Sequence, residues 1–170
     1  LLAAGNGPAA GGVRGVPERA VLDGPIVVTQ LPAGNARERQ PSPAGGMLRA
    51  AFGEGARIVL VLPDSSRRLL TGQFHSACDP ELSRDGTRML FAGKRTAEER
   101  WHIYELGLDG SNLRQITKGP VDCRSPGYQS TLFTLDSPVP WYQLTFLGTH
   151  PGAVNECGSA PLTNLYSCKL

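Results

Sequence analysis

Short runs of apolar and β-branched residues, each bounded by turn-forming residues, recur along the chain. Residues 25–31 (PIVVTQL), 57–62 (RIVLVL), 88–92 (RMLFA) and 101–106 (WHIYEL) are four such runs. Runs of this length between clusters of glycine, proline, aspartate and serine are typical of β-strands. The pattern therefore predicts an all-β chain of short strands.

The stretch from residue 79 to residue 117 carries the clearest turn signals. Asp85-Gly86 and Asp109-Gly110 each separate two apolar runs, as expected of tight turns in β-hairpins. The stretch then contains four short strands in about forty residues, which is the strand count and length of one β-propeller blade. We predict a complete four-stranded antiparallel blade over 79–117.

The same pattern occurs again on both sides of this blade. Ile103 follows Ile58 by 45 residues, and each begins an apolar strand, an Asp-containing turn and a strand that ends in an aliphatic residue and threonine. A third copy starts near Leu165, which is 62 residues after Ile103. The larger spacing predicts an insertion of about 17 residues in that copy.

The repeats divide the chain into four parts. Residues 1–24, rich in glycine, alanine and proline, are predicted to be a poorly ordered lead-in. Residues 25–78 are predicted to form a partial blade with a long loop, and residues 118–170 a partial blade with an insertion, cut short before its next turn. Because blades bury their apolar faces against each other, we expect the remaining propeller blades as partners.

The composition agrees with this prediction and excludes several classes of function. Twenty-one glycines and 14 prolines favour many turns over long helices. A net charge of +2 does not provide the basic surface of a nucleic-acid-binding protein, and no apolar run is long enough to span a membrane. The sequence contains no Gly-x-Ser-x-Gly and no phosphate-binding loop, so it predicts neither a serine hydrolase site nor a nucleotide site here.

The stretch 79–117 resembles the repeat of the TolB-type six-bladed propellers. The resemblance is carried by the following residues: Pro80, Ser83-Arg84-Asp85-Gly86, Met89-Leu90-Phe91, Ile103-Tyr104, Asp109-Gly110 and Ile116-Thr117. Arg84 stands where the family has proline. The resemblance implies a periplasmic or secreted protein whose blades surround a channel, with the first strand of each blade lining it. A protein partner or a small ligand would then bind at the channel face.

Two segments between the predicted blades contain the candidate site, which the resemblance places at the channel mouth. They contribute six residues: His75, Cys78, Asp79, Asp122, Cys123 and Arg124. Cys78 lies seven residues after Thr71 and Cys123 six after Thr117, so the repeat puts them at nearly equivalent places. Three hypotheses stay open: a disulfide, a metal or ligand site that includes the nearby His and Asp residues, or buried thiols with a structural role.

A narrower resemblance concerns residues 122–126 and 141–144, which are similar to the propeller region of hydrazine-synthase-like, haem-associated periplasmic proteins. No CxxCH motif for haem attachment occurs in the sequence. We therefore predict a binding or scaffolding module with no catalytic residue, cofactor or metal in these 170 residues. The alternatives are the propeller part of a haem-associated redox enzyme and the propeller domain of a prolyl-oligopeptidase-like hydrolase.

Overall fold

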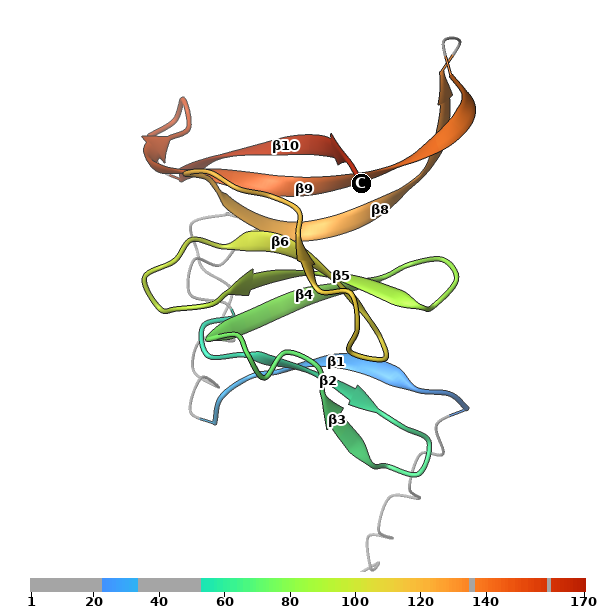
Figure 1. Cartoon of the computed structure of the whole chain (residues 1–170). Coiled ribbons are helices and arrows are strands. Elements are labelled where there is room, and N and C mark those ends of the chain that lie inside the picture. The colour runs from blue at the N-terminus through green and yellow to red at the C-terminus, as the bar shows by residue number, and fades with distance from the viewer. Residues whose placement is uncertain (1–22, 34–52, 135–136, 159) are drawn as a thin grey trace, which may run out of the picture.

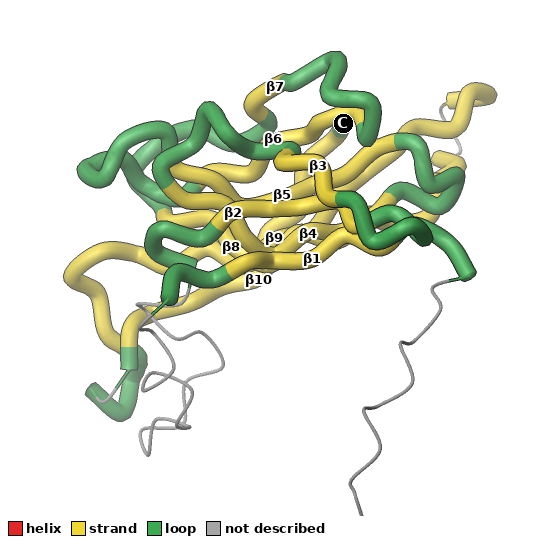
Figure 2. The backbone as a smooth tube through the Cα atoms, turned by 90° about the horizontal axis from the view of Figure 1, so that it is seen from below, coloured by secondary structure: helices red, strands yellow, loops and turns green. Residues whose placement is uncertain are grey.

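Three antiparallel sheets are stacked face to face in the computed structural model, which describes residues 23–33, 53–134, 137–158 and 160–170 (Figure 1). These residues contain strands and turns and no helix (Figure 2). The prediction of an all-β fold of antiparallel propeller-type sheets is confirmed. In this part of the chain, no helix is long and apolar enough to cross a membrane.

The first sheet contains β1 (Ile26–Gln30), β2 (Arg57–Val61) and β3 (Arg67–Leu69), in that order. The predicted lead-in at residues 1–24 lies outside the described residues except for its last two, and so does most of the long loop between β1 and β2.

The second sheet is the complete four-stranded unit. It contains β4 (Ser76–Leu82), β5 (Arg88–Lys94), β6 (His102–Gly107) and β7 (Arg114–Gln115), in sequence order. It begins at Ser76, three residues before the predicted start at Asp79, because the pairing of β4 with β5 already includes Ser76.

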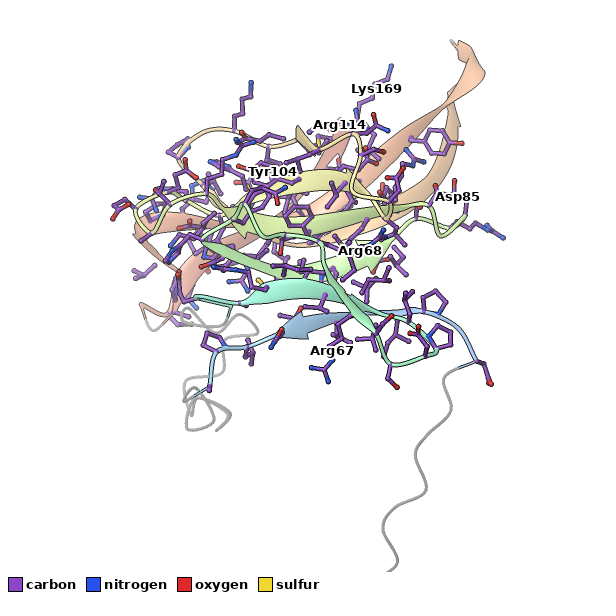
Figure 3. The ribbon with its side chains drawn as sticks, turned by 60° about the horizontal axis from the view of Figure 1, so that its bottom comes forward. Arg67, Arg68, Asp85, Tyr104, Arg114 and Lys169 are labelled. Carbon is purple, nitrogen blue, oxygen red and sulfur yellow. The ribbon has the colours of Figure 1, made fainter. Side chains whose placement is uncertain are left out.

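The two Asp-Gly turns of this sheet are fixed by their aspartates. The Asp85 carboxylate accepts hydrogen bonds from the Ser83 hydroxyl (2.6 Å) and the Thr87 backbone N–H (3.0 Å), and these bonds lower its pKa to about 2. Figure 3 shows Asp85 at the far end of the hairpin, away from the buried Tyr104. Gly110 has a φ of 93°, which glycine adopts without steric cost. Both aspartates therefore serve the turns, as their place in a repeat predicts.

The third sheet contains β8 (Asp122–Thr134), β9 (Ser137–Val154) and β10 (Pro161–Lys169), with β9 in the centre. Residues equivalent to those of the second sheet are 46 positions later in the first strands (Ala77 and Cys123), 55 in the second (Gly93 and Gly148) and 62 in the third (His102 and Asn164). The rise from 46 to 55 adds nine residues to the β8–β9 hairpin, and the rise from 55 to 62 adds seven to the β9–β10 connection. The predicted insertion is thus divided between two places.

The last threonine of each repeat has the same buried role in both complete copies. Thr71 Oγ1 accepts a hydrogen bond from the Ile58 backbone N–H (2.9 Å), and Thr117 Oγ1 accepts one from the Ile103 backbone N–H (2.8 Å). Each threonine thereby satisfies a buried donor of the third strand, which would otherwise destabilise the sheet. This explains in physical terms the aliphatic-Thr pattern of the sequence.

Two hydrophobic clusters fill the spaces between the sheets. The cluster between the first and second sheets contains Ile58, Leu60, Leu70, Phe74, Ala77, Met89, Phe91, Tyr104 and Leu106. The cluster centred between the second and third sheets contains Ala56, Cys78, Leu90, Ala92, Trp101, Ile103, Cys123, Leu144 and Phe146. Neighbouring residues of β4 and β5 alternate between the two clusters, because successive side chains of a strand point to opposite faces.

Candidate functional site

The two segments that we predicted as inter-blade loops are mostly strand. Cys78 and Asp79 lie in β4, and Asp122, Cys123 and Arg124 begin β8, whereas His75 precedes β4. Their first residues are held by hydrogen bonds to the preceding repeat, from Ala77 N to Ala56 O (3.0 Å) and from Cys123 N to Trp101 O (2.8 Å). This pairing extends the strands into the segments, which the turn residues of the sequence do not indicate.

The two cysteines are one residue out of register with each other. In the strand pairing Ala77 is equivalent to Cys123, and Cys78 is equivalent to Arg124. A shift of one residue turns a side chain to the other face of its sheet. Cys78 therefore faces the third sheet and Cys123 faces the second, and both enter the same hydrophobic cluster.

Both cysteines are free, buried thiols in the structure. Burial raises the pKa of Cys78 despite the nearby Arg124, and burial also raises the pKa of Cys123. A raised pKa disfavours the thiolate, which is the nucleophile and the metal ligand. In the part of the chain that is described, no group of three or more His, Cys, Asp or Glu residues could hold a metal ion. The geometry therefore favours the third hypothesis, of buried thiols that pack in the core.

Asp79 and Arg124 form an ion pair between the first strands of two neighbouring sheets. Asp79 Oδ2 accepts hydrogen bonds from Arg124 Nε (3.0 Å) and from the Ser125 backbone N–H (3.1 Å). Only 7% of the Arg124 side chain and 17% of the Asp79 side chain are exposed. Asp79 and Ser125 each precede a proline within a register shift, with φ angles of 55° and 50°. The carboxylate of one bulge thus binds the backbone of the next.

The indole of Trp101 lies between two cations. The Arg124 guanidinium is 4.4 Å from the ring centroid and Lys94 Nζ is 5.6 Å from it, within the range of cation–π attraction. Lys94 in turn pairs with Glu54 at 2.9 Å. We call Glu54, Lys94, Trp101, Arg124 and Asp79 the clasp. It joins residues of all three repeats, and each cation has both a carboxylate and an aromatic partner.

The remaining candidates have different surroundings. Asp122 accepts hydrogen bonds from the Trp101 backbone N–H (3.0 Å) and from Arg100 (2.9 Å), so it also joins the third sheet to the second. His75 is exposed, and its backbone carbonyl accepts a hydrogen bond from Arg57. The structure therefore brings Asp79 and Arg124 together, places Asp122 beside Trp101, and leaves His75 outside the clasp.

A second polar cluster, which the sequence analysis missed, surrounds Glu105. Its carboxylate, with a side chain only 6% exposed, binds Arg114 (2.6 Å), Arg88 (3.4 Å) and the Tyr128 hydroxyl (3.0 Å). Burial and the neighbouring Glu105 charge raise the pKa of Tyr128, so that the hydroxyl stays protonated and donates. The arginines are half-exposed, and Arg114 is labelled in Figure 3. Tyr128 belongs to β8, so this cluster also connects the second and third sheets.

Sequence analysis also missed Glu54, Lys94 and Trp101 as members of the clasp. One signal was available for Trp101, which takes the position that Ala56 has in the preceding repeat, 45 residues earlier. A large aromatic residue at a position that is small in the other copy indicates a local contact that the repeat alone does not require. Glu54 and Lys94 carry no such signal, because a charged residue beside a turn is most often solvated.

Comparisons with known proteins add a resemblance to one enzyme. No family model matches the sequence. Over 76 residues the chain is 42% identical to hydrazine synthase subunit alpha of Kuenenia stuttgartiensis, and this match covers 44% of the chain and 9% of that protein. The structure matches a solved chain of Kuenenia stuttgartiensis hydrazine synthase with a TM-score of 0.67 and 26% identity, over 85% of this chain and 20% of that one.

These matches support the narrower of the two resemblances. The chain spans less than a tenth of the curated relative and about a fifth of the solved chain. The TolB-type resemblance stays a prediction. In sequence and in the arrangement of its sheets, the chain is similar to part of hydrazine synthase.

Proposed function

We propose that this chain is a scaffolding segment of a β-propeller within a longer periplasmic or secreted protein of the hydrazine-synthase type. One observation carries the scaffolding role. Asp79, Asp122 and Arg124 make inter-sheet polar contacts, and Cys78 and Cys123 pack in the core between sheets. Five of the six candidate residues thus stabilise the stack and orient it, so the segment would hold other groups in place.

The similarity to hydrazine synthase supports a redox enzyme as the context of this scaffold. The residues of this chain do not fit covalent haem attachment, because none of its four cysteines begins a CxxCH motif and Cys78 and Cys123 are buried. In our proposal the redox group is therefore bound by another part of the longer protein. This segment would contribute a rigid wall and a face for a partner or a small ligand.

The test compares two aspartates in the full-length protein. Asp79→Asn weakens the clasp, and Asp85→Asn is the matched control in an exposed turn of the same sheet. If the segment is a scaffold, Asp79→Asn lowers the melting temperature more than Asp85→Asn does, and turnover per folded molecule is the same in both. Loss of turnover at an unchanged melting temperature in Asp79→Asn would assign a catalytic role to this site and contradict the proposal.

The redox context has its own readout. The full-length protein is expected to show the absorption spectrum of bound haem and to form hydrazine. If it shows neither, the hydrazine-synthase context is wrong, whereas the stability comparison of the two aspartates still tests the scaffold.

A further inference from the structure

The β8–β9 hairpin continues well past the point where the corresponding hairpin of the second sheet turns back. Tyr128 pairs with Leu144 as Leu82 pairs with Met89, after which β4 and β5 are joined by a short turn. β8 and β9 instead continue to Thr134 and Ser137. We call residues 129–143 the arm; residues 135 and 136 at its tip lie outside the described residues. In Figure 1 the arm rises away from the other two sheets at the upper right.

The arm is a two-stranded ribbon over most of its length. The third strand of its sheet, β10, accompanies β9 only as far as the pair Lys169–Gln143, followed by a hydrogen bond from Leu170 N to Tyr142 O (3.0 Å). Six residues of strand from Tyr128 to Thr134 extend about 20 Å. An isolated two-stranded ribbon is marginally stable in water, so the arm needs a further surface to pack against.

The composition of the arm is that of a buried interface. One of its 15 residues is charged and three are aromatic, whereas 19% of the whole chain is charged and 6% is aromatic. Centres of protein interfaces are depleted of charge and enriched in aromatic residues in the same way. Tyr142, whose side chain position is described, is 57% exposed although it is a large aromatic residue.

The covering surface would contact a face of the ribbon and would not extend its edge. Pro138 and Pro140 in β9 cannot donate to an added strand, and the pairing of β8 shifts register on both sides of Leu132. Prolines and bulges at an edge disfavour the addition of a strand. The occupant therefore needs an apolar, weakly charged surface that packs on the side chains of the arm.

We propose that the arm docks onto an apolar surface of another domain of the same longer polypeptide. This inference rests on the proposed function, which makes the chain part of a longer protein. The similar solved chain extends over four-fifths of its length beyond the matched part, so the same polypeptide offers the largest surface that is always present at the arm. Docking would fix the orientation of the propeller segment relative to that domain.

The test measures hydrogen–deuterium exchange in the full-length protein. Amides in residues 129–134 and 137–143 are expected to exchange at least about tenfold more slowly than those of the exposed turn at residues 84–87, which has no covering surface. In the arm variant, residues 129–143 are replaced by the sequence of residues 83–88 (SRDGTR), which removes the nine additional residues and restores the short turn. A peptide outside these 170 residues is then expected to lose about tenfold of its protection.

A milder pair of variants keeps the test decisive if the shortened protein fails to fold. Tyr142→Ser lies in the arm, and Val154→Ser, a similarly exposed position at the other end of β9, is the control. Only Tyr142→Ser should increase exchange in the docked domain. Rapid exchange of the arm in the unaltered protein overturns the docking, and a loss of protection confined to a different polypeptide overturns the choice of occupant. Exchange is measured without haem or turnover, so its outcome is separate from that of the proposed function.

Discussion

The two interfaces of this stack use the same backbone arrangement and different side chains. Between the first and second sheets, Phe74 packs edge-on against Phe91 and Tyr104, with ring centroids 5.1 and 4.8 Å apart. Between the second and third sheets, an apolar cluster is accompanied by the clasp and by the Glu105 cluster. In both interfaces a strand of the later sheet donates to the backbone of the earlier repeat.

The difference teaches how a repeat tolerates changes in its contacts. Apolar burial contributes stability without strong orientation, because the hydrophobic effect is non-directional. Ion pairs and hydrogen bonds at fixed distances select one register, and they are costly if one partner is lost. We therefore expect the first interface to respond to changes of volume and the second to changes of charge.

The largest effect is expected from Phe74→Ala in the first interface. Phe74 is 2% exposed and contacts two aromatic rings, so its truncation should lower the free energy of unfolding by about 3–5 kcal/mol. Urea denaturation of the full-length protein checks this, with the more exposed Leu82→Ala as control. Equal losses in the two variants would show that the aromatic group is not the main contact of this interface.

A smaller effect is expected from Asp79→Asn in the second interface. The variant keeps the shape of the side chain and removes the charge that Arg124 binds, at a cost of about 2 kcal/mol. Because the pair is mostly buried, the loss should change little between low and high salt. A loss that disappears in high salt would indicate that the pair is solvated, and the comparison of the two interfaces would then fail.

Ser65→Gly should stabilise the first sheet and make its turn more like that of the second. Ser65 has a φ of 67° at the place where the next repeat has Gly110, 45 residues later. Removing the side chain relieves the strain of the left-handed conformation, and the net gain after the entropy cost of glycine is about 0.5–1 kcal/mol. The neighbouring Ser66→Gly, with no such strain to relieve, should destabilise instead. Thermal denaturation distinguishes the two.

The smallest effect is a pH dependence that we assign to His102. Burial lowers its pKa below the usual value of 6.5, and its Nδ1 is buried with no hydrogen-bond partner among the described residues. The unfolded chain therefore takes up this proton at a higher pH than the folded chain does. Stability should fall as the pH drops below about 6.5 and level off below the folded pKa. His102→Gln should flatten this part of a stability–pH curve, and an unchanged slope would exclude His102 as its source.

Much of the fold could be predicted from local signals. The Asp85 and Asp109 turns and the strands around them depend on residues close together in sequence, so the four-stranded unit was predicted with an error of three residues at its start. The size of the insertion also followed from the repeat spacing. Its division between a hairpin and a connection depends on strand pairing, which the spacing of one copy does not determine.

The candidate site was predicted less completely, for a physical reason. Spacing placed Cys78 and Cys123 at nearly equivalent positions, but a strand reverses its faces at every residue, so an error of one changes which side each thiol occupies. The partners Glu54, Lys94 and Trp101 come from three separate segments, and no pattern in one segment indicates them.

By itself, the sequence determined that the chain is all-β, that it repeats every 45 residues, and where its principal turns lie, because turns and strand periodicity are local properties. Only the tertiary structure decided that Asp79 binds Arg124, that Trp101 lies between two cations, and that the thiols face one core cluster. These contacts arise when neighbouring sheets are stacked in one register, which brings together side chains tens of residues apart in the sequence.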